Sequence, residues 1–215
     1  MIRTHLQLAH GNHIILPDEF QNDDVRFSDS VVEFFLKEFT NDGDVVFDPF
    51  AGYGTTLLIA ESMKRIGYGI EYTGRKAEYI RGLLKRPDNL VHGDSRLLLG
   101  YELPPFDLCF TSPPYTNKED DENPFTDYSE RDYEYSSYLR DIKHIFAQVS
   151  QKMKPSAHVV IEVSNLKRRR EVTPLAWDIA REVSQVLHFD GEIILCWDNN
   201  SYGYNHGYCL VFSKE

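Results

Sequence analysis

Apolar residues in this chain form two kinds of pattern. Short apolar runs recur along the chain, as in buried strands, and between several of them apolar residues repeat at the spacing of one helix face. The runs that predict strands are 45–47, 68–71, 90–94, 107–111, 158–163, 192–197 and 208–212. The segments that predict helices are 30–39, 138–153, 174–186 and one that begins near residue 57. This alternation is typical of an α/β protein.

Seven strands, with helices between the first five or six, predict one doubly wound, Rossmann-like sheet. The last two runs flank an Asn-Asn-Ser-Tyr-Gly segment at 199–203, which is typical of a hairpin. At 41% hydrophobic, 215 residues suit one core of substantial size, and neither a repeat nor a linker divides them. We therefore expect residues 1–215 to form a single domain.

The strand at 107–111 is followed by an unusual rigid corner, Ser112-Pro113-Pro114-Tyr115. Proline cannot donate to a sheet ladder, so the strand must end there. The corner presents a hydroxyl on Ser112, a carbonyl on Pro113 and a flat ring on Tyr115. These groups can grip a planar molecule that carries an NH2 group, because two acceptors take its hydrogens and the ring stacks on its face.

A glycine turn lies upstream, between the strand at 45–47 and the helix near 57. Gly52 and Gly54 permit a tight turn and let a ligand approach the backbone. Further strands end in carboxylates: Glu71 is placed to accept hydrogen bonds from ribose hydroxyls, and Asp94 to receive an adenine amino group. Each feature alone is typical of an ordinary loop or helix cap, but their order along one sheet edge indicates a nucleoside cofactor.

Together these motifs resemble a known family, the S-adenosylmethionine-dependent amino-methyltransferases that act on exocyclic amino groups of DNA bases. Segment 48–56, Asp-Pro-Phe-Ala-Gly-Tyr-Gly-Thr-Thr, resembles the family's cofactor motif, and 112–115 resembles its catalytic motif. The resemblance implies S-adenosylmethionine as cofactor, DNA as partner, and a mostly parallel methyltransferase sheet whose last strand is antiparallel. Serine at the first catalytic position is the variant associated with the 4-amino group of cytosine, rather than the 6-amino group of adenine.

The resemblance also implies a set of site residues. A segment comparable to Phe27 and Ser28 flanks the methionine end of the cofactor in the family, and Ser28 with Asp29 is placed to cap the helix at 30–39. The expected catalytic residues are Ser112, Pro113, Pro114 and Tyr115. The expected cofactor-binding residues are Phe27, Ser28, Asp48, Pro49, Phe50, Gly52, Gly54, Thr55, Glu71 and Asp94.

The expected chemistry is positioning without a covalent intermediate. An aromatic amine is a poor nucleophile because its lone pair is delocalised into the ring. Hydrogen bonds to Ser112 Oγ and the Pro113 carbonyl would favour a pyramidal nitrogen and aim its lone pair at the methyl group. A base within duplex DNA would first have to be flipped out of the stack. Carbon-5 methylation is disfavoured because it needs a cysteine nucleophile, and Cys109 lies within the strand.

Charge is an obstacle to nucleic-acid binding, because the net charge is −11 and phosphates are bound by Lys and Arg. The segment 116–135 is acidic and is expected to be either a solvated, mobile loop, which we favour, or a gate that orders around positive charge. The basic residues that could contact phosphates near the cleft are Lys167, Arg168, Arg169 and Arg170. A solvated turn is nearly as good an interpretation of that quartet.

Other classes of site are not indicated. The three cysteines, Cys109, Cys196 and Cys209, are expected to be buried reduced thiols, and the histidines show no metal-ligand spacing. No run is long enough to span a bilayer, and residues 1–13 lack the layout of a secretion signal, so we expect a cytoplasmic protein without a membrane partner.

The sequence leaves two alternative functions open. Acidic charge and small size leave an RNA base amino-methyltransferase open, and a catalytically silent methyltransferase-like binding subunit is a further hypothesis. We expect no separate target-recognition domain, so sequence recognition would come from a second copy of the chain, in a homodimer, or from a separate specificity subunit. All of these hypotheses except the silent subunit require the cofactor motif and residues 112–115 to open onto one cavity.

Overall fold

The computed structural model describes residues 4–8, 11–21, 26–168, 171–201 and 204–214. Its main sheet has eight strands. They are β1 (His5–Gln7), β2 (Val45–Asp48), β3 (Ile66–Glu71), β4 (Leu90–His92), β5 (Phe106–Thr111), β6 (Met153–Val163), β9 (His188–Ser201) and β10 (Tyr204–Ser213). All seven predicted runs are strands, and β1 brings the count to eight instead of seven; it has a single apolar residue, Leu6, and so left no pattern to detect.

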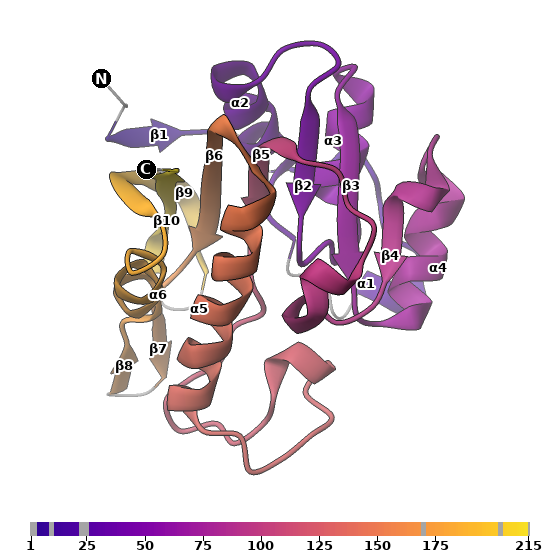
Figure 1. Ribbon diagram of the computed structural model, residues 1–215. Coiled ribbons are helices and arrows are strands. Elements are labelled where there is room, and N and C mark those ends of the chain that lie inside the picture. Colours follow the sequence, from indigo (N-terminus) through magenta and orange to yellow (C-terminus); the bar gives the residue numbers. More distant parts are fainter. Residues whose placement is uncertain (1–3, 9–10, 22–25, 169–170, 202–203, 215) are drawn as a thin grey trace.

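The strands lie in the order β1-β9-β10-β6-β5-β2-β3-β4 (Figure 1). Strand β10 is antiparallel to both of its neighbours, and every other pairing in this sheet is parallel. From β2 the chain builds outward through β3 and β4, then returns to form β5 on the other side of β2. The strand order therefore reverses between β2 and β5, where ligands bind in doubly wound sheets.

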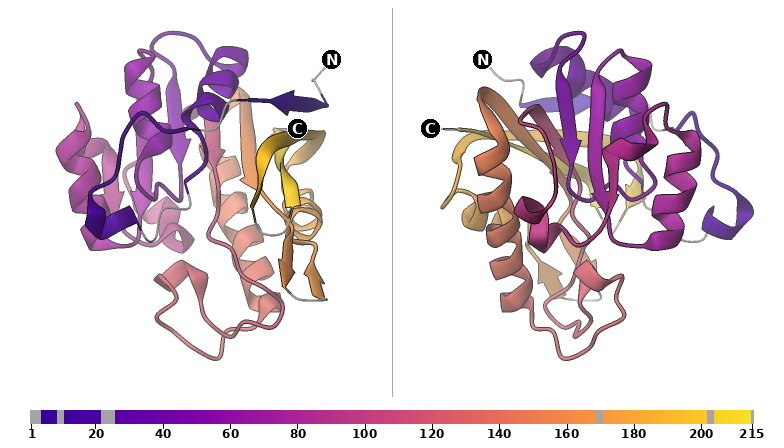
Figure 2. Two further views of the ribbon diagram at one scale, coloured as in Figure 1. Left: turned by 180° about the vertical axis from the view of Figure 1, so that it is seen from behind. Right: turned by 45° about the vertical axis from the view of Figure 1, so that its right-hand side comes forward.

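Helices cover both faces of the sheet, as the views in Figure 2 show. The α-helices are α1 (Asp18–Gln21), α2 (Asp29–Phe39), α3 (Thr55–Ser62), α4 (Gly74–Leu83), α5 (Tyr135–Lys152) and α6 (Leu175–Val183). Short 3-10 helices are η1 (Pro87–Asn89), η2 (Ser95–Gly100) and η3 (Pro124–Thr126). The predicted helix at 138–153 begins earlier, and the one at 174–186 ends earlier.

Successive side chains of a pleated strand point to opposite faces of the sheet, so each central strand contributes to two cores, one on each face. On β2, Val46 packs with α2 while Phe47 packs with α5 and α6; on β5, Leu108 and Phe110 share the first core and Cys109 the second. These residues are at most 3% exposed. Because both faces are buried, the central strands read as continuous apolar runs in the sequence.

Ser28 and Asp29 do not cap α2 with their side chains, contrary to the sequence prediction. Ser28 stands at the N-cap position but makes no capping hydrogen bond, and its hydroxyl donates to the Gly11 carbonyl at 2.9 Å. The Asp29 carboxylate instead accepts hydrogen bonds from the backbone N–H and the ring of His13. Both side chains are used to fasten the segment before α2.

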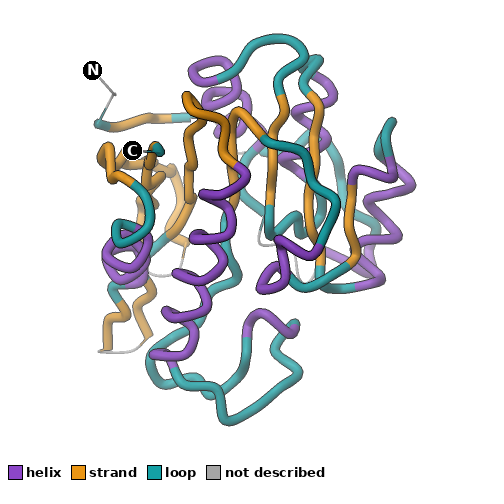
Figure 3. Tube along the Cα trace, in the orientation of Figure 1, coloured by secondary structure: helices purple, strands orange, loops and turns teal. Residues whose placement is uncertain are grey.

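The acidic loop, defined here as residues 116–134, is packed only in part. Six of its eight acidic residues are exposed, as the favoured prediction of a solvated segment requires, whereas residues 123–126 are buried. It runs from β5 to α5 beyond the carboxyl ends of the strands and contains the short turn η3 (Figure 3). Within it, Asn123, Phe125 and Thr126 are at most 5% exposed, and Pro124 is also buried. Asn123 organises the loop, because its side chain donates to Glu130 and accepts from the Phe125 N–H.

A two-stranded hairpin was not predicted. Strand β7 (Leu166–Arg168) pairs antiparallel with β8 (Glu171–Thr173), outside the main sheet. Of the basic quartet, Lys167 and Arg168 lie on β7, whereas Arg169 and Arg170 fall outside the described residues. The charged sequence of this segment shows no apolar alternation from which a hairpin could have been inferred.

Cys109 and Cys209 are buried free thiols as predicted, whereas Cys196 is only partly buried. Burial raises the pKa of the Cys109 and Cys209 thiols. Among the described residues, no cluster of three or more potential metal ligands occurs. In the same part of the chain, no helix combines the length and apolar character that a membrane crossing requires.

Candidate functional site

One cavity of about 510 Å³ opens at the point where the strand order reverses. This volume lies within the range of roughly 300–1,000 Å³ typical of small-molecule sites. It brings together both motifs that the sequence singled out. The predicted residues that line it are Phe27, Ser28, Pro49, Phe50, Gly52, Thr55, Glu71, Asp94, Ser112, Pro113, Pro114 and Tyr115.

Two predicted cofactor residues, Asp48 and Gly54, do not line the cavity but support its wall. The Asp48 Oδ1 atom accepts hydrogen bonds from Thr111 Oγ1 at 2.6 Å and from the Phe50 N–H at 2.9 Å. Burial raises the pKa of Asp48 to about 6. Gly54 has φ +79°, and a Cβ there would lie 2.6 Å from Cγ2 of Ile80. Gly54 is therefore needed for backbone conformation and packing.

Glu71, at the end of β3, joins the two halves of the cofactor motif. Its Oε2 accepts from the Gly52 N–H and its Oε1 from the Thr73 N–H, both at 2.8 Å. Burial raises the pKa of Glu71, while these hydrogen bonds and the nearby Lys76 oppose the rise. Each carboxylate oxygen keeps a further acceptor position, so Glu71 can receive hydroxyl hydrogens from a ligand.

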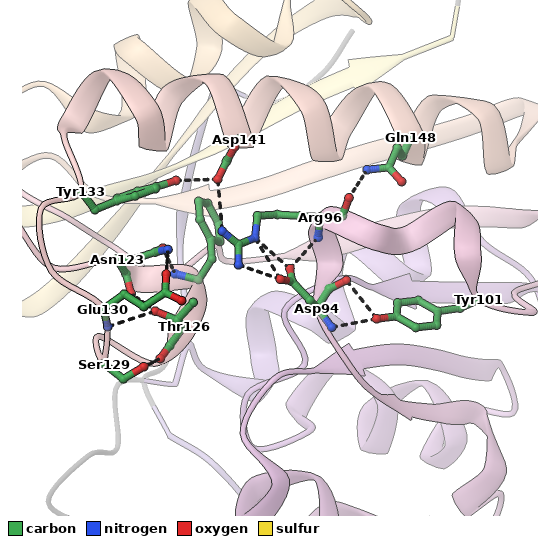
Figure 4. Close-up of polar contacts among 11 residues, drawn as sticks. Asp94, Arg96, Tyr101, Asn123, Thr126, Ser129, Glu130, Tyr133, Asp141 and Gln148 are labelled. Atoms are coloured by element: carbon green, nitrogen blue, oxygen red, sulfur yellow. Dashed lines mark hydrogen bonds and ion pairs between the residues drawn. The ribbon is translucent and has the colours of Figure 1, made fainter.

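Asp94, after β4, is held by an arginine that the sequence reading did not consider. Arg96 Nε donates to both carboxylate oxygens at 3.0 Å, Nη2 donates to Oδ2 at 2.7 Å, and the Arg96 N–H donates to Oδ1 at 2.9 Å (Figure 4). Oδ1 therefore has both of its lone pairs in use. Oδ2 likewise accepts from Nε and Nη2, so an amino group approaching Asp94 would have to share an oxygen with Arg96.

The corner at 112–115 stands against a second buried carboxylate, Glu162. This residue is 8% exposed, lies near the end of β6 and lines the cavity. Burial raises its pKa to about 7, and hydrogen bonds from the side chains of Ser112 and Tyr115 limit that rise. The Tyr115 hydroxyl donates to Glu162 Oε2 at 3.3 Å and accepts from the Ser164 N–H at 3.0 Å. The ring of Tyr115 is therefore fixed at its hydroxyl end.

The acidic loop supplies another wall of the cavity. Its lining residues are Asn117, Pro124, Phe125, Asp127 and Tyr128. The Tyr128 hydroxyl donates to the Tyr115 carbonyl at 2.8 Å, and the Phe125 ring stacks on Tyr138 with centroids 5.3 Å apart. The loop is thus connected directly to the predicted catalytic corner.

The basic residues were expected near the cleft, and Lys167 directly follows a residue that lines the cavity. Lys167 and Arg168 are exposed and do not line the cavity, although Leu166 beside them does. Arg168 forms an ion pair with Asp120 of the acidic loop, with 2.8 Å between Nη1 and Oδ1. The positive charge of Arg168 is therefore partly neutralised by Asp120.

The donors and acceptors of the cavity fit a nucleoside cofactor with a charged tail. Thr55 Oγ1 is buried in the wall and has no hydrogen-bond partner among the described residues, so a bound ligand would satisfy it. Glu71 offers acceptors for ribose hydroxyls. Phe27, Phe50 and Ile70 form an apolar part of the cavity wall. These residues fit S-adenosylmethionine.

Sequence reasoning missed Glu162 and every cavity residue of the acidic loop. A charged residue inside the apolar run at 158–163 was a signal for Glu162, because buried carboxylates are rare without a partner. The loop residues carried no such signal, since their charged neighbours indicated solvent exposure. Arg26 and Lys76 also line the cavity and were not predicted.

Part of this chain is similar to a known protein family. The family described as DNA methylase, of the N6/N4 type, matches residues 14–82. The DNA adenine methyltransferase YhdJ of Escherichia coli (strain K12) is 35% identical over 77 residues, which cover 36% of this chain and 25% of YhdJ. The matched part of this chain thus spans about a quarter of the length of that curated relative.

Solved structures show the fold of a methyltransferase. TrmN from Thermus thermophilus superposes with a TM-score of 0.64 at 15% identity, covering 91% of this chain and 52% of TrmN. Precorrin-6y C5,15-methyltransferase from Geobacter metallireducens GS-15 gives 0.56 at 16% identity, covering 89% and 91% of the two chains. Residues 14–82 of this chain are therefore similar to the DNA methylases of the N6/N4 type, and most of the chain shares the fold of these methyltransferases.

Proposed function

We propose that this chain transfers a methyl group from S-adenosylmethionine to an exocyclic amino group of a DNA base, with the 4-amino group of cytosine as the preferred target. The observation that carries the proposal is the shared cavity, because the cofactor motif and residues 112–115 line one space. A methyl donor and an amine acceptor can meet only if both sites open onto each other.

The cofactor would occupy the side of the cavity formed by β2, β3 and the start of α3. Glu71 would accept the ribose hydroxyls, the unpartnered Thr55 hydroxyl would bond to the ligand, and Phe27 and Ser28 would flank its methionine end. S-adenosylmethionine, when bound, supplies an electrophilic methyl group on a sulfonium.

The target amine would be held at the opposite side by the corner at 112–115. Its two hydrogens would point to Ser112 Oγ and the Pro113 carbonyl, and Tyr115 would stack on the base. Ser112 lowers the pKa of Glu162, so the two side chains lie near each other. A Ser112 hydroxyl that donated to Glu162 would keep its lone pairs available for the amine.

Glu162 also provides a destination for the proton that the reaction releases. Transfer of the methyl group, in which its bond to the sulfonium sulfur breaks and the electron pair stays on sulfur, would leave the amine nitrogen cationic with one proton to lose. That proton passes to the Ser112 oxygen while the Ser112 hydroxyl proton passes to Glu162. A carboxylate with a pKa of about 7 is ionised in half of the molecules near neutral pH and is well matched to this task.

The nucleic-acid surface would be formed by the rim of the cavity. Lys167 and Arg168 lie on the hairpin next to Leu166, and we propose that they, with Arg169 and Arg170, contact phosphates. With a net charge of −11, the affinity of this chain alone for a polyphosphate should be weak and strongly reduced by salt. We propose that the chain acts as one catalytic unit, and that a second copy or a separate subunit supplies further DNA contacts.

Labelled methyl transfer tests the substrate class. The purified chain is incubated with labelled S-adenosylmethionine and, separately, with unmethylated DNA and structured RNA, followed by mass spectrometry of the nucleosides. N4-methylcytosine in DNA would support the proposal as stated. N6-methyladenine in DNA would support amino-methyl transfer but show that adenine, and not cytosine, is the target base. Methylation of RNA alone overturns the DNA assignment. Failure of the folded chain to bind S-adenosylmethionine in calorimetry favours the silent binding subunit.

A further inference from the structure

Arg96 lies behind the cavity wall and contacts side chains from three separate segments. Its guanidinium grips both oxygens of Asp94, lies 3.5 Å from Oδ2 of Asp141 on α5, and is centred 6.0 Å from the Phe125 ring of the acidic loop. Figure 4 shows Arg96 between the two carboxylates. Its carbonyl also accepts from Gln148 at 2.8 Å, which ties the backbone of η2 to α5.

Two of these neighbours line the cavity and come from different segments of the chain. Asp94 belongs to the part built by β4, where the adenine end of the cofactor is expected, and Phe125 belongs to the acidic loop. The Phe125 ring also lies 5.9 Å from Phe50 of the cofactor motif. Arg96 therefore stands where the cofactor side and the loop side of the cavity join.

The acidic loop has a second attachment to the same arginine. The Tyr133 hydroxyl donates to Asp141 Oδ2 at 2.6 Å, the oxygen that faces Arg96 (Figure 4). One end of the loop is thus held by Tyr133 and its middle by Phe125. A shift of Arg96 would disturb both attachments together with Asp94.

Electrostatics explains why an arginine is needed here. Asp94 and Asp141 both lie within reach of one guanidinium, so its removal would leave two partly buried carboxylates without their shared counter-charge. A planar, bidentate donor fixes the orientation of Asp94 as well as its charge. Lysine would keep the charge but lose the fork geometry.

We propose that Arg96 is a positioning residue that sets Asp94 for the adenine end of the cofactor and at the same time holds the acidic loop against the cavity. Cofactor binding and loop order then depend on each other, since coupling between two sites is reciprocal. The identity of the cofactor rests on the proposed function, whereas the attachment of the loop to Arg96 does not.

The test compares the full-length chain with Arg96→Gln and Arg96→Lys, and uses Arg140→Gln as the matched control. Arg140 is exposed on α5, bonds only to Ser137 among the described residues, and does not line the cavity. Hydrogen–deuterium exchange of peptides from 116–134 measures loop order, and calorimetry with S-adenosylmethionine measures affinity. Exchange in peptides from β6 reports whether each variant remains folded.

We expect Arg96→Gln to exchange at least tenfold faster in 116–134 with β6 unchanged, and to bind S-adenosylmethionine at least tenfold more weakly. Arg96→Lys should recover part of both effects, and Arg140→Gln should match the parent chain. In the parent chain, S-adenosylmethionine should slow exchange of the loop, and this protection should be lost in Arg96→Gln.

Normal loop exchange in folded Arg96→Gln would overturn the proposal, as would weakened binding with unchanged loop protection. If β6 also exchanges faster in Arg96→Gln, the comparison moves to Tyr133→Phe, which removes only the hydroxyl that bonds to Asp141. Loop exchange equal to the parent in that variant also overturns the proposal. Failure of the parent chain to bind S-adenosylmethionine would contradict the proposed function, while the exchange rates without cofactor would still test the role of Arg96.

Discussion

Thr111 and Asp48, which stand 63 residues apart in the sequence, are joined by a hydrogen bond of 2.6 Å from Thr111 Oγ1 to Asp48 Oδ1. Asp48 begins the cofactor motif, and Thr111 directly precedes the catalytic corner. The bond joins the carboxyl ends of the neighbouring strands β2 and β5, where the strand order reverses. It fixes the two motifs relative to each other beneath the cavity, and this proximity is what the proposed methyl transfer requires.

Thr111→Val should destabilise the protein in a pH-dependent way. The hydrogen bond from Thr111 favours ionised Asp48, whose pKa burial raises to about 6. Losing a hydrogen bond to a buried carboxylate costs about 2 kcal/mol. That loss should appear at pH 8, where Asp48 is ionised, and shrink at pH 5, where it is mostly protonated. Denaturant unfolding at the two pH values measures it, and an equal loss at both would contradict the assignment.

Ser112→Ala and Glu71→Ala should have opposite effects. Ser112→Ala should slow methyl transfer by about 100-fold with nearly unchanged cofactor affinity, because it removes an acceptor for the amine. Glu71→Ala should weaken cofactor binding by about 10- to 100-fold, because it removes a charged acceptor. Single-turnover rates and calorimetry separate the two effects. A collapse of cofactor affinity in Ser112→Ala would mean that its role is misassigned.

Glu162→Gln should change the pH dependence of the rate. In the parent chain the rate should rise with pH through about 7, because only ionised Glu162 can accept the proton from Ser112. The variant should be slower and should lack this rise. Rates of methyl transfer from pH 5.5 to 8.5 provide the measurement. If the rate rose with pH in both proteins and with the same midpoint pH, the titrating group would be a residue other than Glu162.

The same substitution should stabilise the protein at high pH. The pKa of Glu162 is raised in the folded state, from 4.5 to about 7. Its contribution to stability is therefore fully present below pH 4.5 and is lost as pH rises through 7. Glutamine removes that loss, so the stability of Glu162→Gln relative to the parent should increase by up to about 3 kcal/mol between pH 4.5 and pH 8. A relative stability independent of pH would show that Glu162 titrates normally.

Gly54→Ala should damage the cofactor turn. Alanine would meet Ile80 at 2.6 Å and would have to adopt a φ of +79°, so we expect a loss of about 1–3 kcal/mol. Gly82→Ala is the matched control, because a Cβ there meets nothing within 4 Å and Gly82 lies inside α4. It should stabilise the protein by about 0.5–1 kcal/mol. Thermal unfolding compares the two, and a neutral Gly54→Ala would contradict the packing argument.

Much of the fold could be predicted because its signals are local. Each central strand is buried on both faces and therefore appears as an apolar run, as 107–111 and 158–163 do. The strand ends marked by Gly52, Glu71 and Ser112 could be placed at one edge, since parallel strands share the direction of their carboxyl ends. The three-residue strand β1 could not be predicted, because its pairing with β9 depends on a partner far away in the sequence.

The acidic loop could be predicted only in part. Six of its eight acidic residues are exposed, as the sequence indicated, yet Phe125 among them is 5% exposed and stacks on Tyr138 of α5. Two of its acidic residues form ion pairs with basic residues of other elements: Asp120 pairs with Arg168, and Asp127 pairs with Lys76. Local composition cannot show such pairings, because the partners come from other elements.

The sequence by itself determined which strand ends carry chemistry, since proline, glycine and carboxylate residues act on the backbone within a few positions of themselves. Only the tertiary structure decided which of these groups share a cavity and what stands behind them. Tyr115 meets Glu162 across 47 residues, and Asp94 is held by an arginine whose other partner lies on α5. These contacts depend on the packing of distant elements, and that packing sets the protonation and orientation of the groups.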